Sequence, residues 1–325
     1  MDATPSVRLP ADAPASGIPE RPPRPITVRG VRFAWGTRTF VMGVINVTPD
    51  SFSGDGVLAK AGSGSGAPAG DSVDPHDAAL ALALEQGRAM AAEGADLLDV
   101  GGESTRPGHP SVDESEELRR VIPVIEALRV ALPEMPISID TIKPAVARAA
   151  LAAGADLIND VWATGSSDEM AHVAAERDVP YVISHNRAEA IYRSVAAEVI
   201  ADLQRAVERA VRAGCAWESL IVDPGIGFGK TPEQNLELLR GLAGLRVLGR
   251  PILLGTSRKS TIGKVLDLPA DQRVEGTLAT TALGIGAGVD IVRVHDVEAN
   301  VRAARMSDAV VRGGWHAPAP SGAAR

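Results

Sequence analysis

The sequence predicts an α/β fold, a single (β/α)8 TIM barrel with a short N-terminal β-hairpin. Eight apolar segments of strand length alternate with Ala- and Leu-rich segments that carry apolar residues at helical spacing. Nearly all strand segments are apolar on both faces, which is typical of parallel strands covered by helices. A chain of 325 residues, 45% of them hydrophobic, is long enough for one barrel domain. An open doubly wound sheet is the alternative, but it usually has fewer strand–helix repeats.

The expected elements follow one another from residue 26 onward. Residues 26–43 predict a hairpin that leads into the first core strand, with glycines at its turns. The eight expected strands lie at 40–46, 96–102, 136–140, 156–160, 181–185, 220–225, 251–257 and 290–296. The helical segments between them include 77–95, 115–132, 144–155 and 197–215. Three of these carry a glycine placed to end the helix: Gly94, Gly154 and Gly214.

Composition sets the limits of the expected barrel domain, which spans 26–312. Residues 1–25 are rich in Pro and Ala and predict a disordered leader, and residues 313–325 predict a flexible tail. A low-complexity stretch predicts a flexible insertion at 57–76, in the loop after the first barrel strand. The sequence shows no signal peptide or membrane segment and has one cysteine, Cys215, so we expect a cytoplasmic protein. A net charge of −8 argues against a nucleic-acid partner.

Polar residues stand at the carboxyl ends of almost all the expected strands. They are Asn46, Asp99, Asp140, Asn159, His185, Asp223, Ser257, and Arg293 with His295. One such residue alone would be explained as a helix N-cap. In a barrel, however, these ends surround a single mouth, which is where barrel enzymes build their active sites. The pattern therefore predicts a shared site at the barrel mouth.

The glycine-rich stretch "IVDPGIGFGKT" (221–231) looks at first like a phosphate-binding loop that ends in Lys230. A P-loop needs a glycine five residues before Gly229, and that position is Pro224. The dinucleotide-binding glycine pattern also fails on spacing. The stretch therefore predicts a backbone-exposing loop after Asp223, which suits close approach of a flat ligand.

The residue types at the mouth favour a planar heterocycle and an anion. Asp140, Asn159 and Asp223 offer acceptor oxygens and Lys259 a cationic donor, which matches the edge of an amino-pyrimidinone ring. Arg293 and His295 are two residues apart on one strand, so their side chains point the same way and predict an anion site, to which Arg106 could add a second cation.

Other catalytic classes lack the residues they need. His185 has no other His at ligand spacing, so no zinc site is expected and a structural hydrogen-bonding role is favoured. No Ser-His-Asp or Cys-His pair is readable, and Cys215 precedes a strand at the wrong end of the barrel for the site.

Taken together, these residues resemble the dihydropteroate synthases, folate-pathway enzymes of the pterin-binding barrel group. The resemblance covers about residues 41–297. It rests on "MGVINVTPDSFS", "GADLLDVGGESTRPG", "ISIDT", "GADLINDV", "VDPGIGFGKTPEQNLELLR", "GTSRKS" and "VRVHDV", in that order. The family joins (7,8-dihydropterin-6-yl)methyl diphosphate to 4-aminobenzoate with release of diphosphate in the presence of Mg²⁺, and the family suggests a homodimer.

The resemblance implies a role for each matching residue. The pterin is assigned to Asp140, Asn159, Asp223, Phe228 and Lys259. The diphosphate is assigned to Asn46, Thr105, Arg293 and His295, with Asn46 also a Mg²⁺ ligand. The aminobenzoate is assigned to Phe52, Thr105, Arg106 and Ser260. Asp55, Asn46 and Arg106 are the implied catalytic residues, and diphosphate loss would leave a pterin cation that buried carboxylates stabilise.

Three departures from the family pattern leave alternatives open. The first loop reads "SFSGDG" where the family more often has "SFSDGG", which displaces Asp55 by one position. The insertion lengthens the same loop, and Ser184 stands where the family usually has Met. A pterin-binding paralogue that has lost turnover is therefore one alternative. A methyltetrahydrofolate-type pterin methyltransferase is another, although it would not need "STRPG", "SRKS" or "RVHD".

Overall fold

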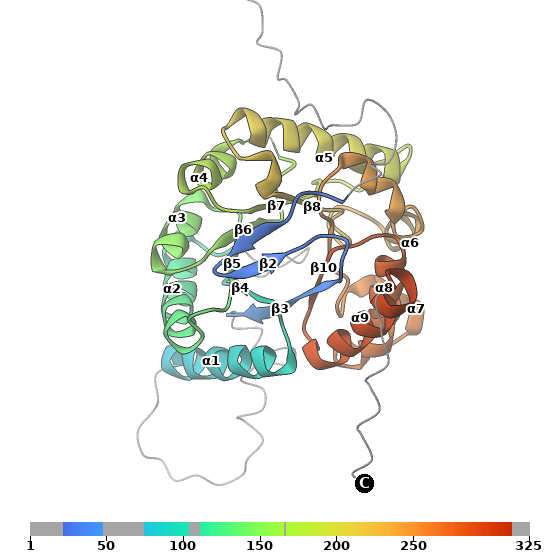
Figure 1. Ribbon diagram of the computed structural model, residues 1–325. Helices are drawn as coiled ribbons and strands as arrows, with labels where there is room; N and C mark the ends of the chain where they lie inside the picture. The colour runs from blue at the N-terminus through green and yellow to red at the C-terminus, as the bar shows by residue number, and fades with distance from the viewer. Residues whose placement is uncertain (1–21, 48–74, 104–110, 166, 314–325) are drawn as a thin grey trace, which may run out of the picture.

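The computed structural model describes residues 22–47, 75–103, 111–165 and 167–313. Eight parallel strands lie side by side in the order 220–223, 181–184, 157–160, 137–140, 97–101, 40–46, 291–294 and 253–254. A parallel bridge between Val222 and Ile252, the residue before the last strand, connects the two edges of this sheet, so the sheet closes into a barrel. Helices surround the strands (Figure 1). The predicted (β/α)8 barrel is therefore confirmed, and so is the N-terminal hairpin.

The strands and helices alternate along the chain as expected. The hairpin consists of β1 (Ile26–Val28) and β2 (Val31–Phe33). The barrel strands are β3 (Phe40–Asn46), β4 (Leu97–Gly101), β5 (Ile137–Asp140), β6 (Leu157–Asp160), β7 (Tyr181–Ser184), β8 (Leu220–Asp223), β9 (Leu253–Leu254) and β10 (Ile291–Val294). The helices are α1 (Pro75–Glu93), α2 (Glu114–Ala131), α3 (Pro144–Ala153), α4 (Glu169–Arg177), α5 (Val195–Arg212), α6 (Pro232–Arg240), α7 (Ser260–Leu266), α8 (Val274–Gly286) and α9 (Val297–Val311).

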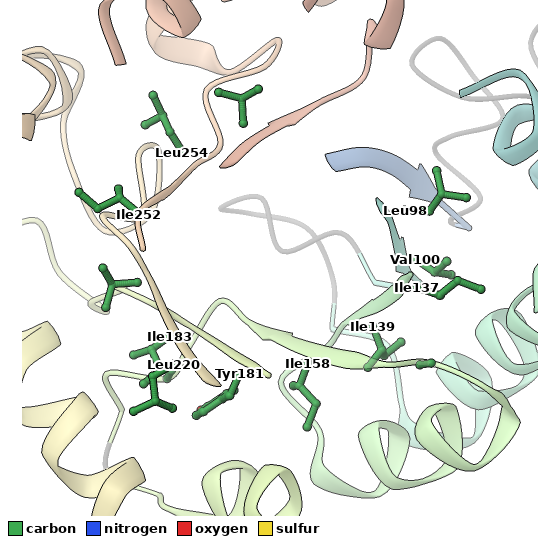
Figure 2. Packing of buried hydrophobic residues seen from close by; sticks show 14 of the residues in the cluster. Leu98, Val100, Ile137, Ile139, Ile158, Tyr181, Ile183, Leu220, Ile252 and Leu254 are labelled. Carbon is green, nitrogen blue, oxygen red and sulfur yellow. The ribbon is translucent and has the colours of Figure 1, made fainter. Parts of the chain in front are cut away.

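Side chains of each strand alternate between two apolar environments. Those that point outward pack against the helices in one large core, part of which Figure 2 shows. Those that point inward near the amino ends of the strands form a second cluster with the hairpin. Because successive side chains of a strand point to opposite faces, this cluster fixes which strand-end residues face the barrel interior. Asn159 follows Leu157 and Ile158 and points inward, whereas its neighbour Asp160 points outward.

The hairpin closes the amino end of the barrel. Phe33 stacks against Trp35 with ring centroids 5.6 Å apart and contacts the tilted ring of Phe40 at a centroid distance of 4.8 Å. These rings pack on Met42 and other inward-facing apolar residues of the strands. Figure 1 shows the hairpin lying across the barrel. Apolar side chains therefore fill the amino end of the barrel, and the polar side chains lie at its carboxyl end.

Smaller expectations from the sequence are also resolved. Gly94, Gly154 and Gly214 follow their helices with φ of 100°, 119° and 106°, the left-handed conformation expected of helix-ending glycines. Cys215 is buried between α5 and β8, as predicted. The strand expected at 251–257 is much shorter, because regular pairing is limited to Leu253 and Leu254.

Several expectations lie outside the described residues. These are most of the leader (1–25), of the insertion (57–76) and of the tail (313–325), together with Phe52, Asp55, Thr105 and Arg106. Within the part of the chain that the structure describes, no helix is both long and apolar enough to cross a membrane.

Candidate active site

The carboxyl ends of the strands bring a set of buried polar side chains into the barrel interior. Asp99 comes from β4, Asp140 from β5, Asn159 from β6, Ser184 from β7, Asp223 from β8 and Arg293 from β10. The parallel register places Asp140 beside Asn159 and Ser184 beside Asp223. Each lies at the end of an apolar strand whose packing leaves the chain no freedom to turn the side chain outward. These residues form the polar layer of the barrel.

Arg293 is the centre of one half of the polar layer. Its Nε donates to Asp99 Oδ2 at 2.5 Å, and one of its terminal nitrogens donates to Asp140 Oδ2 at 2.6 Å. Asn159 Nδ2 also donates to Asp99 Oδ2, at 3.0 Å. Three buried oxygens of this group have no hydrogen-bond partner among the described residues: Asp99 Oδ1, Asp140 Oδ1 and Asn159 Oδ1. Such oxygens are costly to bury alone and are well suited to accept hydrogen bonds from a ligand.

One cation shared by two carboxylates perturbs the ionisation of this group. Burial raises the pKa of Asp140 to about 7, an effect that Arg293 opposes and Asp99 reinforces. Burial alone would lower the pKa of Arg293, but Asp99 and Asp140 raise it above its ordinary value. The guanidinium therefore stays charged while Asp140 can gain or lose a proton near neutral pH. Perturbed carboxylates of this kind are typical of functional sites.

Asp223 anchors the other half of the polar layer. Its Oδ1 accepts from the backbone N–H of Gly225 at 2.7 Å, and its Oδ2 accepts from Ser184 Oγ at 3.3 Å. Burial raises the pKa of Asp223, and the positive charge of Lys259 acts in the opposite direction. The Lys259 ammonium lies 4.2 Å from the centroid of the Phe228 ring and also donates to the carbonyl of Ile226. Lys259 thus brings a positive charge close to Asp223 and lies against the face of the Phe228 ring.

A third group lies where β3 and β10 end. Asn46 Nδ2 and His295 Nε2 are 3.5 Å apart, and His295 Nδ1 is hydrogen-bonded to Ser257 Oγ at 3.0 Å. The backbone N–H of His295 donates to the same hydroxyl at 3.1 Å. If Asn46 Nδ2 donates to His295, the amide oxygen of Asn46 is left for another partner. This group offers an imidazole and an amide oxygen at the mouth.

The structure brings together most of the predicted site residues that it describes. Asp140 lies beside Asn159, Lys259 contacts Phe228 and acts on the charge of Asp223, and Asn46 lies 3.5 Å from His295. Ser260 follows Lys259 and begins α7, where it is exposed. Arg293, predicted for an anion, is bound through two of its nitrogens to the carboxylates of Asp99 and Asp140, and its assignment to the diphosphate stays a prediction.

Two residues of the polar layer, Asp99 and Ser184, were not predicted as site residues from the sequence. Asp99 stood among the strand-end residues but received no role, because nothing in its residue type distinguished it from the others. Ser184 was noted only as a departure from the family pattern, and its hydrogen bond to Asp223 shows that it belongs to the polar layer. Strand-end position was the available signal in both cases.

Comparisons with known proteins agree with this geometry. Residues 71–295 match the model of the pterin binding enzyme family. Dihydropteroate synthase from Bacillus subtilis is 48% identical over 280 residues, which cover 86% of this chain and 91% of the relative. The enzyme from Clostridium beijerinckii is 46% identical, with 86% and 97% covered. The chain belongs to the dihydropteroate synthases. It is therefore a transferase, and the predicted activity is confirmed in preference to the methyltransferase alternative.

Solved structures of the family match over the same range. The Clostridium difficile dihydropteroate synthase, determined in the presence of pteroic acid, has a TM-score of 0.77 and 48% identity and covers 86% of this chain and 99% of its own. The Xanthomonas albilineans synthase with 4-aminobenzoic acid has a TM-score of 0.77 and 41% identity, with 89% and 98% covered.

Proposed function

We propose that the polar layer is the pterin site of this dihydropteroate synthase. The observation that carries the proposal is that buried oxygens of Asp140 and Asn159, in the same polar layer as Asp223, have no hydrogen-bond partner among the described residues. An amino-pyrimidinone edge carries adjacent N–H donors, which these acceptors can receive, beside a carbonyl that Lys259 can meet. Phe228 would stack on the ring. The pteroic acid of the Clostridium difficile structure supports a ligand of this kind.

The diphosphate is assigned to Asn46, Thr105, Arg293 and His295. Asn46 and His295 lie next to each other, and Arg293 is charged at every relevant pH, so the edge of the polar layer can hold an anion. The Asn46 amide oxygen also fits Mg²⁺, an ion that proteins often bind through one or two oxygens while substrate phosphates supply the rest. Bound Mg²⁺ would neutralise charge that develops on the departing diphosphate.

The chemistry follows from these charges. The bond from the pterin methylene carbon to the diphosphate oxygen breaks, and its electron pair leaves with the diphosphate. The dihydropterin cation that remains is stabilised by Asp140 and Asp223, the buried carboxylates beside it. The aniline nitrogen of 4-aminobenzoate then bonds to the methylene carbon and gives up a proton to the released diphosphate or to water. No strong base is needed, because an aniline is uncharged at neutral pH.

The second substrate is assigned to Phe52, Thr105, Arg106 and Ser260, with Asp55 and Arg106 joining Asn46 as catalytic residues. Ser260 supports this assignment, since it is exposed directly after Lys259. The 4-aminobenzoic acid of the Xanthomonas albilineans structure supports the substrate class.

We further propose one barrel domain over 26–312, a cytoplasmic location and a homodimer. An apolar surface on neighbouring helices supports the dimer: Leu283 of α8 is 75% exposed, and Met306 and Val310 of α9 are 65% and 72% exposed. Large exposed apolar groups that gather on adjacent helices are typical of protein contacts.

Diphosphate release tests the proposed function directly. The protein is incubated with the pterin diphosphate, 4-aminobenzoate and Mg²⁺, and diphosphate is measured against a blank without enzyme. Release that requires both substrates supports the proposal. Pterin binding without release would instead favour the paralogue that has lost turnover.

A further inference from the structure

Lys230, the lysine of the stretch that looked like a phosphate loop, turns inward and binds that loop itself. Its ammonium donates to the carbonyl oxygens of Gly225 and Phe228, both at 3.0 Å. Its third contact is His185 Nδ1, at 2.9 Å. These three acceptors surround the nitrogen, so its protons are used within the protein rather than offered to a ligand.

The number of acceptors matches the charged form of the lysine. An ammonium carries three N–H donors, whereas a neutral amine carries two. When Lys230 is charged, His185 accepts through Nδ1, and its Nε2 then carries the proton and faces Asp202 Oδ2 at 3.1 Å. Burial lowers the pKa of His185 to about 3, so the imidazole stays neutral. Two hydrogen bonds in series, from Asp202 to neutral His185 and from His185 to Lys230, thus connect a carboxylate to the ammonium of Lys230.

The segment that Lys230 holds is also the one that carries part of the pterin site. Gly225, Gly227 and Gly229 all have positive φ. Because glycine has no side chain to restrict its backbone, the conformation of this segment depends on the hydrogen bonds that hold it. Lys230 links the carbonyl at one end of this turn to the carbonyl of Phe228. Between them lies Ile226, whose carbonyl accepts from Lys259. The positions of Phe228 and of Lys259 therefore both depend on the conformation of 225–229.

We infer that Lys230 is a positioning residue for the pterin. Its ammonium, which is hydrogen-bonded to His185 and through it linked to Asp202, holds residues 225–229 in the conformation that positions Phe228 and Lys259. The inference rests on the proposed assignment of those two residues to the pterin. Lys230 does not touch the ligand and acts through the loop.

The charge of Lys230, and with it the affinity for pterin, should depend on pH. Burial lowers the pKa of Lys230 to about 7; Asp223 and Asp202 oppose this change, whereas Lys259 and Arg187 add to it. His185 is neutral throughout. Loss of the third proton above about pH 7 removes one of the three bonds, so the affinity for pterin should fall as the pH rises through this range.

The experiment measures pterin affinity by fluorescence titration with the pterin diphosphate between pH 6 and 9. The full chain is compared with Lys230→Met, Lys230→Arg, Asp202→Asn and the control Lys264→Met, an exposed lysine on α7. For Lys230→Met we expect Kd for pterin to rise by about tenfold or more, the scale of one lost charged hydrogen bond, while KM for 4-aminobenzoate changes by less than about twofold. Lys230→Arg keeps its charge and should recover part of the affinity without the alkaline fall.

The outcomes separate this inference from the function on which it rests. Asp202→Asn should weaken pterin binding in the same direction as Lys230→Met, and thermal unfolding checks that both variants are folded. Wild-type affinity in folded Lys230→Met, or an alkaline fall unchanged in Lys230→Arg, would overturn the inference. A wild-type protein that neither binds the pterin nor releases diphosphate would instead overturn the proposed function.

Discussion

Arg293 Nε lies 2.5 Å from Asp99 Oδ2, although the two residues are 194 positions apart in the sequence. The side chain of Asp99 is fully buried and that of Arg293 is 18% exposed. The same guanidinium also binds Asp140, so one cation organises two carboxylates of the polar layer. Asp99 therefore acts on the proposed pterin site through Arg293, without being one of the residues assigned to the ligand.

Replacing Asp99 with Ala should destabilise the protein strongly. The substitution takes one of two carboxylates from the buried guanidinium of Arg293 and removes the acceptor of Asn159 Nδ2, and breaking a buried ion pair costs up to about 3–5 kcal/mol. The free energy of unfolding, measured in denaturant, should fall by an amount of this order. The control is Glu298→Gln, which breaks the exposed pair with Arg302 on α9 and should cost no more than about 1 kcal/mol. Similar losses in the two variants would contradict this account of the polar layer.

Asp223 and Asp160 provide a matched test of the pterin site. Both are buried acids at the ends of parallel strands, β8 and β6, but Asp223 faces the barrel interior, whereas Asp160 points outward and accepts from Tyr181. Asp223→Asn should weaken pterin binding by at least about tenfold, because an acceptor for ligand N–H groups is lost. Asp160→Asn should change it by less than about threefold. Titration of pterin fluorescence compares them, and equal losses would count against the assignment.

Asp140 should make the stability of the free protein depend on pH. Its pKa is raised from 3.8 to about 7 by burial, so between about pH 4 and 7 the folded state holds more protons than the unfolded state. The free energy of unfolding should therefore decrease as the pH rises through this window, by up to about 4 kcal/mol. Asp140→Asn removes this contribution. Denaturant unfolding at pH 5 and pH 8 measures it, and an equal pH response in both proteins would refute the expectation.

The sequence was sufficient for the barrel and for the gathering of polar side chains at the carboxyl ends of its strands. Strand and helix periodicity predicted the alternation of elements, and the polar residues at strand ends predicted the mouth. Contacts inside the site were not predictable, since they join residues that only the closed barrel brings together. No local pattern links Asp202 on α5 to His185 after β7 and to Lys230 before α6. The same holds for Arg293, whose ion pairs with Asp99 and Asp140 join residues far apart in the sequence.

The glycine at position 225 is required by the space around it. Gly225 has a φ of +66°, and a Cβ added there would lie 1.8 Å from the carbonyl oxygen of His185. Gly225→Ala should therefore lower the free energy of unfolding by more than about 2 kcal/mol and weaken pterin binding. At Gly286, near the end of α8, a Cβ would meet nothing within 4 Å, and Gly286→Ala should be neutral or stabilising by up to about 1 kcal/mol. Thermal and denaturant unfolding of the two alanine variants would show whether the difference is as large as expected.

Charge placed on the apolar surface of α8 and α9 should disrupt the proposed homodimer. Leu283→Asp would force a carboxylate into a contact formed by apolar side chains, and burying an unpaired charge costs several kcal/mol. Light scattering coupled to size-exclusion chromatography should then show a shift from dimer to monomer. Val130→Asp on α2 is the control, because Val130 is 85% exposed on a different helix. A dimer that survives Leu283→Asp, or that Val130→Asp disrupts equally, would place the interface elsewhere.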